Sequence, residues 1–493
     1  MRRHCPKSRF VIYYATKKGY SGMIGRIEEI KAIRKAYDSD HSEFVAVYGR
    51  RRVGKTFLIN EVFNYRFAFH TSGIEGGSRT MQLSAFRDAL KRQGHSSCPR
   101  LTSWISAFSE LENMLEKMPA GKKVVFLDEL PWFDTPCSGF LKAFEFFWNG
   151  WATSRKDILL VICGSATTWI VNEILRARGG LHNRVTRQLP LAPFTLKECE
   201  DYANYKNLGF DRRQVLECYM VFGGVAYYWS LLQEGQSAAQ NIDRLFFGAT
   251  DEMRNEFNRL FSSLFKSPTR HVEIVKLLGL KKNTMSRDEI IGELREKSSG
   301  DISKCLEELS QCGFLLTSRM IGKKKKGTLY QLIDPYMLFY FQFVAAWLGN
   351  DERHWSLNYH SARTNSWRGQ AFERICLMHA KQIKRAIGIQ GVEADIYSWR
   401  WMPKSSDDTG VQIDMLIDRA DGIVNLCEIK YSEEKYLLDK TEDAEIRHRT
   451  EVFRRESGVR KAIQPVLVAA NGVADSKYLG NIQMIVEGTA LFE

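Results

Sequence analysis

The stretch FVAVYGRRRVGKT, residues 44–56, decides the fold that we predict for the first part of this chain. Phe44 to Tyr48 is typical of a buried strand, and Phe57 to Phe63 is typical of a following helix. Between them, Gly49, Gly54, Lys55 and Thr56 have the spacing G-x-x-x-x-G-K-T. The backbone N–H groups of such a loop converge on phosphate oxygens at a helix N-terminus. We therefore expect Lys55 on the β- and γ-phosphates of a nucleotide and the Thr56 hydroxyl on its Mg²⁺.

An acidic pair follows a later apolar run. In KKVVFLDELPW, the strand-like residues Val124 to Leu127 end in Asp128 and Glu129. A carboxylate at the C-terminal end of a strand beside a phosphate loop can hold Mg²⁺ through water, and its neighbour can orient or deprotonate the attacking water. We assign the first role to Asp128 and the second to Glu129.

Two further segments could contact the γ-phosphate. The run DILLVICGSATTW predicts a strand ending near Ser165, whose hydroxyl could bond to that phosphate or to the attacking water. A helix cap is the alternative for this serine, and it stays open. The segment LHNRVTRQLPLAPFT predicts a fifth strand that begins near Arg184 and Arg187. Either arginine could act as an arginine finger or be solvated, and we favour Arg184.

Strand, loop and helix alternate along the first part of the chain. This order predicts an α/β fold, the parallel sheet of a P-loop NTPase with helices on both faces and a ligand at the carboxyl ends of the strands. Helical patterns continue from Thr195 to Phe265. We expect the core at residues 23–195 and a helical lid at residues 196–265.

Five motifs in this order resemble the archaeal-type ATPase family within the AAA+/STAND class. They are Gly25-Arg26 with Glu29, GRRRVGKT, FLDELPW, the CGSA strand and FGGVAYY. The resemblance covers roughly residues 23–260 and implies that Arg26 and Glu29 lie near the adenine and that Ser165 is the sensor. It also implies that the loop residues bind ATP, namely Gly49, Arg50, Arg51, Arg52, Val53, Gly54, Lys55 and Thr56. The GGVP of the family reads Gly223-Gly224-Val225-Ala226 here, so the lid turn can differ.

Composition indicates a folded protein of about three domains. The chain has 493 residues, of which 44% are hydrophobic and 26% charged, as is ordinary for folded proteins. A net charge of +13 favours a polyanion such as double-stranded DNA as a partner. The ten cysteines contain no C-x-x-C pair, which indicates reduced thiols in a cytoplasmic protein and implies neither zinc nor disulfides.

No segment of the sequence predicts a membrane span or a signal peptide. The longest apolar run, Tyr336 to Gly349, is shorter than the roughly 20 residues that a span needs, and we expect a buried core helix there. Residues 1–22 are basic and lack an uninterrupted apolar segment. We expect a disordered extension there, and the true start could be Met1 or Met23.

Residues 266–350 predict three short amphipathic helices, a β-hairpin and a connecting helix. The hairpin signal is TSRMIGKKKKGTLYQLID, with Lys323 to Lys326 at its tip. Three helices and a hairpin resemble a winged helix, whose tip lysines suit phosphate contacts. A solvated lysine loop or a protein-binding module is the alternative.

Residues 351–493 carry a second group of acids. The strands VQIDMLID and IVNLCEIK flank a turn in which we expect Gly422 to be left-handed, and this register sets Asp414 opposite Glu428. Strand alternation puts Lys430 on the face of Glu428. Glu373, on an expected helix, could complete the group.

Two carboxylates and a lysine on one face of a hairpin suit a divalent metal and an activated water. Asp414, Glu428 and Glu373 would bind the metal, and Lys430 would position the water or steady charge on phosphorus. These residues resemble the PD-(D/E)xK nuclease superfamily, whose core is an α/β restriction-endonuclease-like fold, and archaeal-type ATPases often resemble this two-part design. The alternative is a charged hairpin face with no catalytic role.

Together the blocks predict an ATP-hydrolysing, DNA-associated protein. Its cofactors would be ATP and Mg²⁺, and nucleotide state would govern the winged helix and the nuclease-like domain. The alternative is a STAND-like switch in which the C-terminal domain only binds partners and the nucleotide controls a homo-oligomer.

Overall fold

The computed structural model describes residues 23–176, 180–181, 183–249, 252–265, 267–281, 284–295, 299–319, 321, 327–401 and 410–493. The described chain divides into two compact units, and the boundary lies between Pro193 and Phe194. The expected extension at residues 1–22 and the lysines 323–326 lie outside the described residues.

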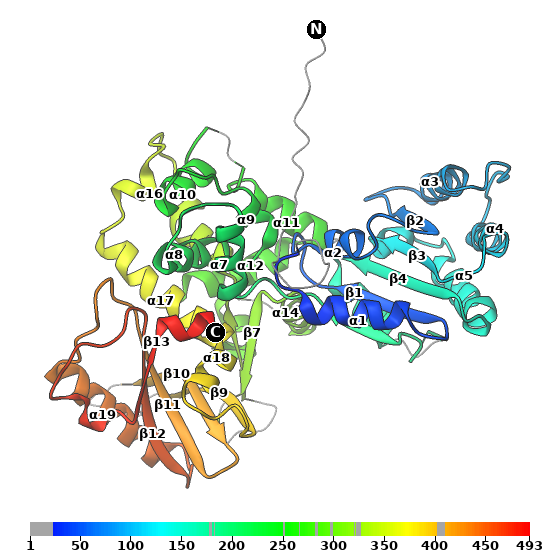
Figure 1. Ribbon diagram of the computed structural model, residues 1–493. Coiled ribbons are helices and arrows are strands. Elements are labelled where there is room, and N and C mark those ends of the chain that lie inside the picture. The colour runs from blue at the N-terminus through cyan, green and yellow to red at the C-terminus, as the bar shows by residue number, and fades with distance from the viewer. Residues whose placement is uncertain are drawn as a thin grey trace. The chain divides into compact units, whose positions relative to one another are not determined.

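The first unit contains a parallel five-stranded sheet (Figure 1). The strands lie in the order β2-β3-β4-β1-β5, with β1 (Glu43–Tyr48), β2 (Phe69–Ser72), β3 (Lys123–Asp128), β4 (Ile158–Gly164) and β5 (Arg187–Pro190). The helices are α1 (Ile27–Tyr37), α2 (Lys55–Val62), α3 (Arg79–Arg92), α4 (Trp104–Glu116), α5 (Phe140–Phe146) and α6 (Thr167–Trp169). Short 3-10 and π-helical turns are η1 (Leu130–Phe133), η2 (Phe147–Trp151), η3 (Ala152–Ser154) and η4 (Ile170–Leu175). This sheet confirms the α/β fold predicted for the first part of the chain.

Both faces of this sheet are buried, which explains why its strands are continuously apolar. Side chains alternate along β1, so that Phe44 and Ala46 join one apolar cluster, whereas Val45 and Val47 join the other. The first cluster includes side chains of α3, α4 and α5, and the second includes side chains of α1 and α2. Helices therefore cover both faces, and the carboxyl ends of the strands are left for the site.

The second unit begins with helices. They are α7 (Leu196–Tyr205), α8 (Arg212–Phe222), α9 (Ala226–Ser230), α10 (Ala238–Phe246) and α11 (Glu256–Leu264). Further along the chain lie α15 (Pro335–Phe339), η6 (Tyr340–Val344), α16 (His354–Leu357), α17 (Ala362–Met378) and α18 (Ala380–Ala386). The two groups pack together, since the Tyr336 hydroxyl donates to the Met253 carbonyl at 2.8 Å and the Trp355 N–H donates to the Asp243 carboxylate at 2.7 Å. The segment expected as a lid therefore shares its core with residues more than a hundred positions away.

The buried helix predicted for Tyr336 to Gly349 is confirmed for its first part, where α15 and η6 bury Tyr336, Met337, Phe339 and Phe343. The helical part ends at Val344, and Leu348 is 96% exposed. Within the parts of the chain that the structure describes, no helix is both long enough and apolar enough to span a bilayer.

A three-stranded antiparallel sheet and three helices lie between these groups. They are α12 (Thr269–Leu280), β6 (Met285–Ser286), α13 (Arg287–Glu293), α14 (Ser299–Gln311), β7 (Leu315–Arg319) and β8 (Thr328–Leu332), with the strand order β6-β8-β7. The helices and the hairpin are those that the sequence predicts. Their assignment as a winged helix stays a prediction, and so does the role of the tip lysines.

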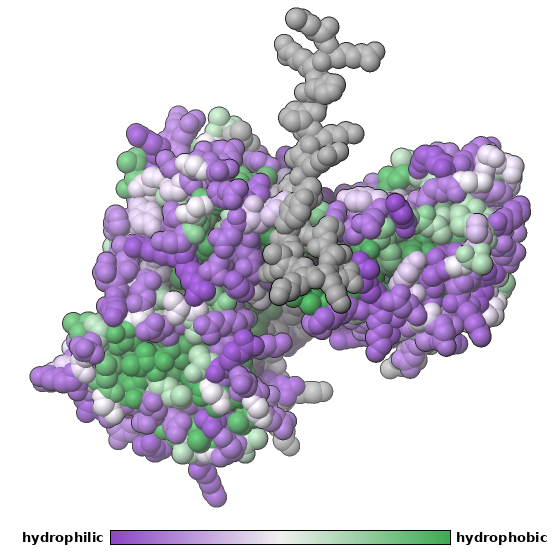
Figure 2. Space-filling view, in the orientation of Figure 1, coloured by the Kyte–Doolittle hydropathy of each residue, from purple (hydrophilic) through white to green (hydrophobic). Residues whose placement is uncertain are grey.

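The last part of the chain forms a mixed five-stranded sheet in the order β13-β12-β11-β10-β9. Its elements are β9 (Ala394–Trp401), β10 (Val411–Arg419), β11 (Ile423–Lys430), α19 (Lys440–Glu456), β12 (Ala462–Ala469), η7 (Leu479–Asn481), β13 (Met484–Glu487) and η8 (Gly488–Phe492). Strands β9, β10 and β11 are antiparallel, and β11, β12 and β13 are parallel. Helix α17 contacts β11, and α19 contacts β10 and β12. Figure 2 shows an apolar surface near β13. Ile485, on β13, is exposed.

Candidate functional site

The phosphate loop joins β1 to α2 and depends on two glycines. Gly49 has a φ of +143°, and a Cβ at this position would lie 2.4 Å from the Leu191 carbonyl oxygen. Gly54, with a φ of +95°, precedes α2. Beyond its chain neighbours, no atom of the described residues lies within 4 Å of a Cβ placed on Gly54. The first glycine thus permits a close backbone approach, and the second permits a left-handed turn at an open position.

Lys55 is buried at the start of α2. Its ammonium donates to the Gly49 carbonyl at 3.0 Å and to the Arg50 carbonyl at 2.9 Å. Burial lowers the pKa of Lys55, although the nearby Asp128 and Glu129 oppose this change. The side chain therefore lies along the loop that the motif assigns to the phosphates.

Asp128 accepts hydrogen bonds at the carboxyl end of β3. The Thr56 hydroxyl donates to its two oxygens at 3.2 and 3.1 Å, and the Glu129 N–H donates at 2.9 Å. The Cys163 thiol also donates to Asp128, since burial raises the pKa of this thiol well above its usual value. The hydroxyl and carboxylate oxygens of Thr56 and Asp128 are the donor set that Mg²⁺ prefers, so these residues fit the ion that the motif implies.

Glu129 follows Asp128 in a left-handed conformation with a φ of +46°. Its carboxylate accepts from the Ser165 N–H and from the Ser165 hydroxyl, each at 3.0 Å. The residue that precedes α6 as its N-cap is Ala166, which makes no side-chain cap. Ser165 therefore bonds to the expected base and does not cap this helix with its side chain.

The residues expected near the adenine lie against the same loop. The buried Arg26 donates to the Val53 carbonyl at 3.4 Å and lies 3.7 Å from the Glu29 carboxylate. The loop residue Arg50 is buried as well, and Arg52 has a φ of +70°. The structure thus brings the GR-x-x-E motif to the end of the phosphate loop.

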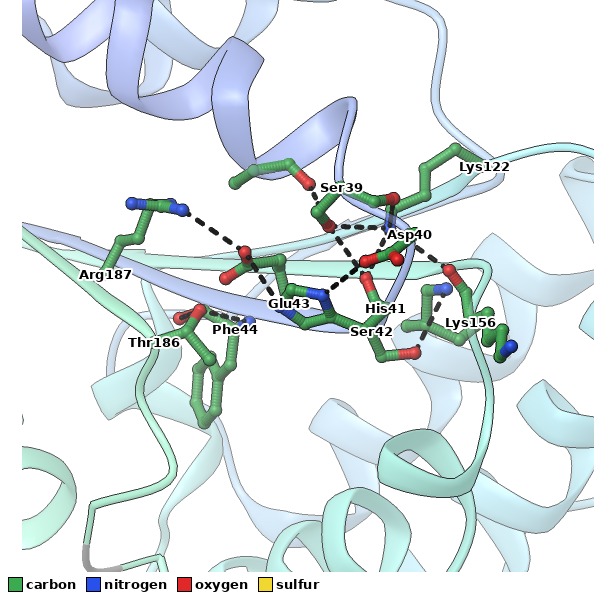
Figure 3. A network of polar contacts seen from close by, with 12 residues as sticks. Ser39, Asp40, His41, Ser42, Glu43, Phe44, Lys122, Lys156, Thr186 and Arg187 are labelled. Carbon is green, nitrogen blue, oxygen red and sulfur yellow. Dashed lines mark hydrogen bonds and ion pairs between the residues drawn. The ribbon is translucent and has the colours of Figure 1, made fainter.

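The two candidates for an arginine finger lie at and before the start of β5, and the role of either stays a prediction. Strand β5 is parallel to β1 with Arg187 beside Val45, so Arg187 lies at the amino end of β5, whereas the phosphate loop follows the carboxyl end of β1. Arg187 points to Glu43, whose carboxylate lies 3.3 Å away (Figure 3). Parallel pairing sets this direction, and the exposed Arg184 lies still earlier in the chain.

The second group of acids lies on the β10–β11 hairpin. The register pairs Met415 with Cys427 and Asp418 with Val424, which is the register predicted for the hairpin. These pairs end at Met415, and the pairing of β10 with β9 shifts between Ile413 and Leu416, so the placement of Asp414 opposite Glu428 stays a prediction. Gly422 has a φ of +87° in the turn, as predicted.

Glu428 has cationic partners on both sides. The Nη1 atom of Arg449, on α19, lies 2.6 Å from each of its carboxylate oxygens. The Lys430 ammonium lies 3.3 Å from Glu428 and 3.4 Å from the Glu442 carboxylate. Burial lowers the pKa of Lys430, but these two carboxylates outweigh burial and raise it overall.

The remaining two acids lie in the same neighbourhood. Asp414 accepts from the Gln412 amide at 2.6 Å. Burial raises the pKa of Glu373, on α17, to about 7, and the charges of Asp414 and Glu428 add to this effect. The structure thus gathers Glu373, Asp414, Glu428 and Lys430, whose roles stay predictions.

Sequence reasoning missed four contacts of these sites. They are made by Cys163 at the phosphate loop and by Gln412, Glu442 and Arg449 at the hairpin. Gln412 lies two positions before Asp414, so strand alternation could have found it. Arg449 lies on a helix with several exposed charges, and its sequence has no feature that selects this arginine.

Two further groups of potential ligands lie away from both sites. His95, Cys98 and Glu110 form one, and the other contains His271, Cys305 and Glu308. In each group the histidine Nε2 is hydrogen-bonded to the glutamate, at 2.5 and 2.7 Å. A metal would have to replace this hydrogen bond.

Residues 23–232 match the model of a family described as an ATPase domain predominantly from Archaea. The first part of the chain therefore carries an archaeal-type ATPase domain, as its motifs predicted. The match ends before the helices and sheets of residues 266–493.

Several known proteins are similar to this chain. An uncharacterized protein of Methanocaldococcus jannaschii is 23% identical over 359 residues, which are 71% of this chain and 76% of that protein. The Walker-type ATPase paby2304 of Pyrococcus abyssi is 17% identical, with a TM-score of 0.47 over 65% of this chain and 96% of that one. The ORC2 protein of Aeropyrum pernix, in ADPNP–ADP complexes, is 14% identical, with a TM-score of 0.39 over 64% of this chain and 91% of that one. At these TM-scores the likeness does not define the fold, which the strand order of the chain itself shows.

Proposed function

We propose that this chain is an ATP-hydrolysing, DNA-associated protein whose C-terminal domain carries a metal-dependent nuclease site. In this proposal, nucleotide state controls that site and the winged helix. The observation that carries the nuclease assignment is the gathering of Asp414, Glu428, Glu373 and Lys430 around one hairpin.

In the ATPase domain, each residue of the site has a separate role in binding or hydrolysing ATP. Lys55 exchanges its two carbonyl partners for phosphate oxygens, and the loop N–H groups bind the same phosphates. Thr56 and Asp128 hold the Mg²⁺, which when bound neutralises charge on the phosphates. Glu129 takes a proton from the attacking water, and Ser165 fixes the position of the Glu129 carboxylate.

In the C-terminal domain, Asp414, Glu428 and Glu373 supply carboxylate oxygens, which suit Mg²⁺ or Mn²⁺. A bound ion would polarise the phosphodiester and lower the pKa of a bound water. Lys430 lies beside Glu428 and either orients that water or balances negative charge on the phosphate. Because these acids interrupt apolar strands, leaving them without compensating partners would cost stability.

The DNA assignment depends on charge and on the element order of residues 266–335. The net charge of +13 favours a phosphate backbone, and the hairpin β7–β8 suits a wing. A homo-oligomer would let Arg184 of one copy act at the phosphates of another.

The nuclease assignment is tested by incubating the protein with linear double-stranded DNA, Mg²⁺ or Mn²⁺, and ATP. We expect cleavage by the wild type, none by Glu428→Ala, and wild-type cleavage by Glu451→Ala, which removes an exposed acid of α19. Equal survival of DNA with the wild type and Glu428→Ala would remove the nuclease assignment.

The contact between Arg449 and Glu428 favours a second candidate function. An acid that is already neutralised by arginine can be purely structural, as in a STAND-like switch whose C-terminal domain binds partners. Size measurements with ADP and with a non-hydrolysable ATP analogue separate the two functions. Nucleotide-dependent assembly without DNA cleavage supports the switch.

A further inference from the structure

Arg449 reaches the hairpin site from the middle of α19. Its Nη1 atom contacts both oxygens of Glu428, and its Nη2 atom donates to Glu445 on the same helix at 3.2 Å. The Arg449 side chain is 29% exposed and the Glu428 side chain 12% exposed. The Lys430 ammonium lies 3.3 Å from one Glu428 oxygen, so both cations contact this carboxylate.

This contact competes directly with metal binding. A divalent ion on Glu428 would bind to one or both of the oxygens that Arg449 contacts. The carboxylates of Glu428 and Glu445 both contact the guanidinium, and their negative charges favour a cation at this point. The guanidinium therefore supplies the positive charge that a metal would otherwise supply.

We propose that Arg449 holds the place of the metal at Glu428 in the metal-free protein and moves to the phosphate of the DNA backbone when the ion binds. This inference rests on the proposed metal site. It adds a residue that contacts the substrate phosphate and that reduces the negative charge of the metal-free site.

The chemistry of the Arg449 side chain supports its proposed contact with the DNA phosphate. A guanidinium presents paired N–H donors that match a phosphate as well as a carboxylate. Glu445 lies one helical turn before Arg449 and can retain its Nη2 atom while Nη1 is exchanged. The displaced arginine thus stays at the rim of the site, where the phosphodiester must approach the ion.

Mn²⁺ titration of the nucleotide-free full chain tests the first half of the proposal. We expect Arg449→Met to bind Mn²⁺ about tenfold more tightly than the wild type, because the competing cation is gone. Arg449→Lys should lie between them, and Arg454→Met, which removes an exposed arginine of the same helix, should match the wild type. Adding Glu428→Gln to Arg449→Met should abolish the gain.

The outcomes separate this inference from the proposed function. If the wild type and Arg449→Met both lack Mn²⁺ binding that depends on Glu428, the proposed metal site fails. If that binding is present but equally strong in both proteins, the metal site stands and the competition by Arg449 is overturned.

DNA affinity tests the second half. With Ca²⁺ as the divalent ion, we expect Arg449→Met to bind linear double-stranded DNA about tenfold more weakly than Arg454→Met, and Arg449→Lys to retain part of the affinity. Tighter Mn²⁺ binding together with weaker DNA binding is the signature of a residue that serves both partners. Unchanged DNA affinity in Arg449→Met would overturn the phosphate role.

Discussion

The phosphate loop site and the hairpin site both place carboxylates on buried strands, yet these acids have different hydrogen-bond donors. Asp128 accepts from a hydroxyl, a thiol and a backbone N–H, and Glu129 accepts from the N–H and hydroxyl of Ser165. Glu428, by contrast, lies between Arg449 and Lys430. The cation of the first site, Lys55, bonds to backbone carbonyls.

This difference separates two ways of keeping acids in a protein. Neutral donors orient a carboxylate and leave its full charge available for a divalent ion. Cationic donors neutralise part of the charge of the carboxylate, and a divalent ion would compete with them for it. In the function proposed here, the first site would bind Mg²⁺ with its nucleotide without displacing a cation, whereas the second would exchange a cationic partner for the ion.

The largest effect is expected for Glu129, whose carboxylate accepts hydrogen bonds from neutral donors. Glu129→Gln should lower ATP turnover by about 10²- to 10⁴-fold, because glutamine cannot take a proton, and should leave ATP binding intact. Turnover and ATP affinity are measured on the same preparation. Unchanged turnover would show that Glu129 is not the catalytic base. The contrast between the acids of the two sites would then have no functional meaning.

The cation of the first site is tested next. Lys55→Ala should weaken ATP binding by about 10²-fold, since charged hydrogen bonds to phosphate are lost. Calorimetric titration gives the affinity, and Lys117→Ala, which removes an exposed lysine at the end of α4, is the control. Equal ATP affinity in Lys55→Ala and the control would contradict the phosphate role of Lys55.

Replacing a glycine by alanine should lower stability more at the phosphate loop site than at the hairpin site. Gly49→Ala should lower the free energy of unfolding by about 2 kcal/mol more than Gly422→Ala. Both have positive φ, but only Gly49 would set a Cβ 2.4 Å from a backbone oxygen, and a Cβ on Gly422 meets nothing within 4 Å among the described residues. Denaturant unfolding gives the free energy of unfolding of both variants. Equal losses in the two variants would mean that the backbone near Leu191 moves away from the new Cβ with little loss of stability.

The smallest effect is a pH dependence in the unit that carries the hairpin. His379 ends α17, accepts from the Leu196 N–H at 3.1 Å through Nε2, and contacts the Ile375 carbonyl through Nδ1 at 2.9 Å. Burial lowers the pKa of His379 to about 4. Below the unfolded pKa of 6.5, the unfolded chain binds a proton that the folded chain does not. The free energy of unfolding therefore decreases as the pH is lowered below 6.5.

Between about pH 7 and about pH 5.5 this histidine should remove about 1 kcal/mol of stability, and more as the pH approaches 4. Thermal unfolding of the wild type and of His379→Gln at several pH values gives the difference. A wild-type curve with the same pH dependence as His379→Gln would show that the histidine is protonated in the folded protein.

Sequence patterns predicted the local parts of both sites. The spacing of Gly49, Gly54, Lys55 and Thr56 predicted the loop, and alternation across a turn with Gly422 predicted the register that pairs Met415 with Cys427. Short-range geometry governs these features, since a turn type or a strand period fixes where neighbouring side chains point. The archaeal-type ATPase domain was recognisable from the order of its motifs.

The contacts that cross between elements needed the tertiary structure. Parallel pairing of β5 with β1 turned Arg187 toward Glu43 and away from the phosphate loop. The segment expected as a lid buries Glu217 and Asp243 against α16, through hydrogen bonds from Trp355. Nothing in the local pattern of either segment specifies its partner.

By itself, the sequence determined the phosphate loop, the acidic strand ends and the hairpin register, because each depends on spacing along a few residues. Tertiary structure decided that Arg449, among several arginines of α19, contacts Glu428, and that Ser165 contacts Glu129. The rotation of a helix against a sheet and the order of parallel strands set these contacts. The rotation of the helix and the order of the strands depend on how entire faces of helices and sheets pack together. The spacing of residues within a short segment therefore does not specify them.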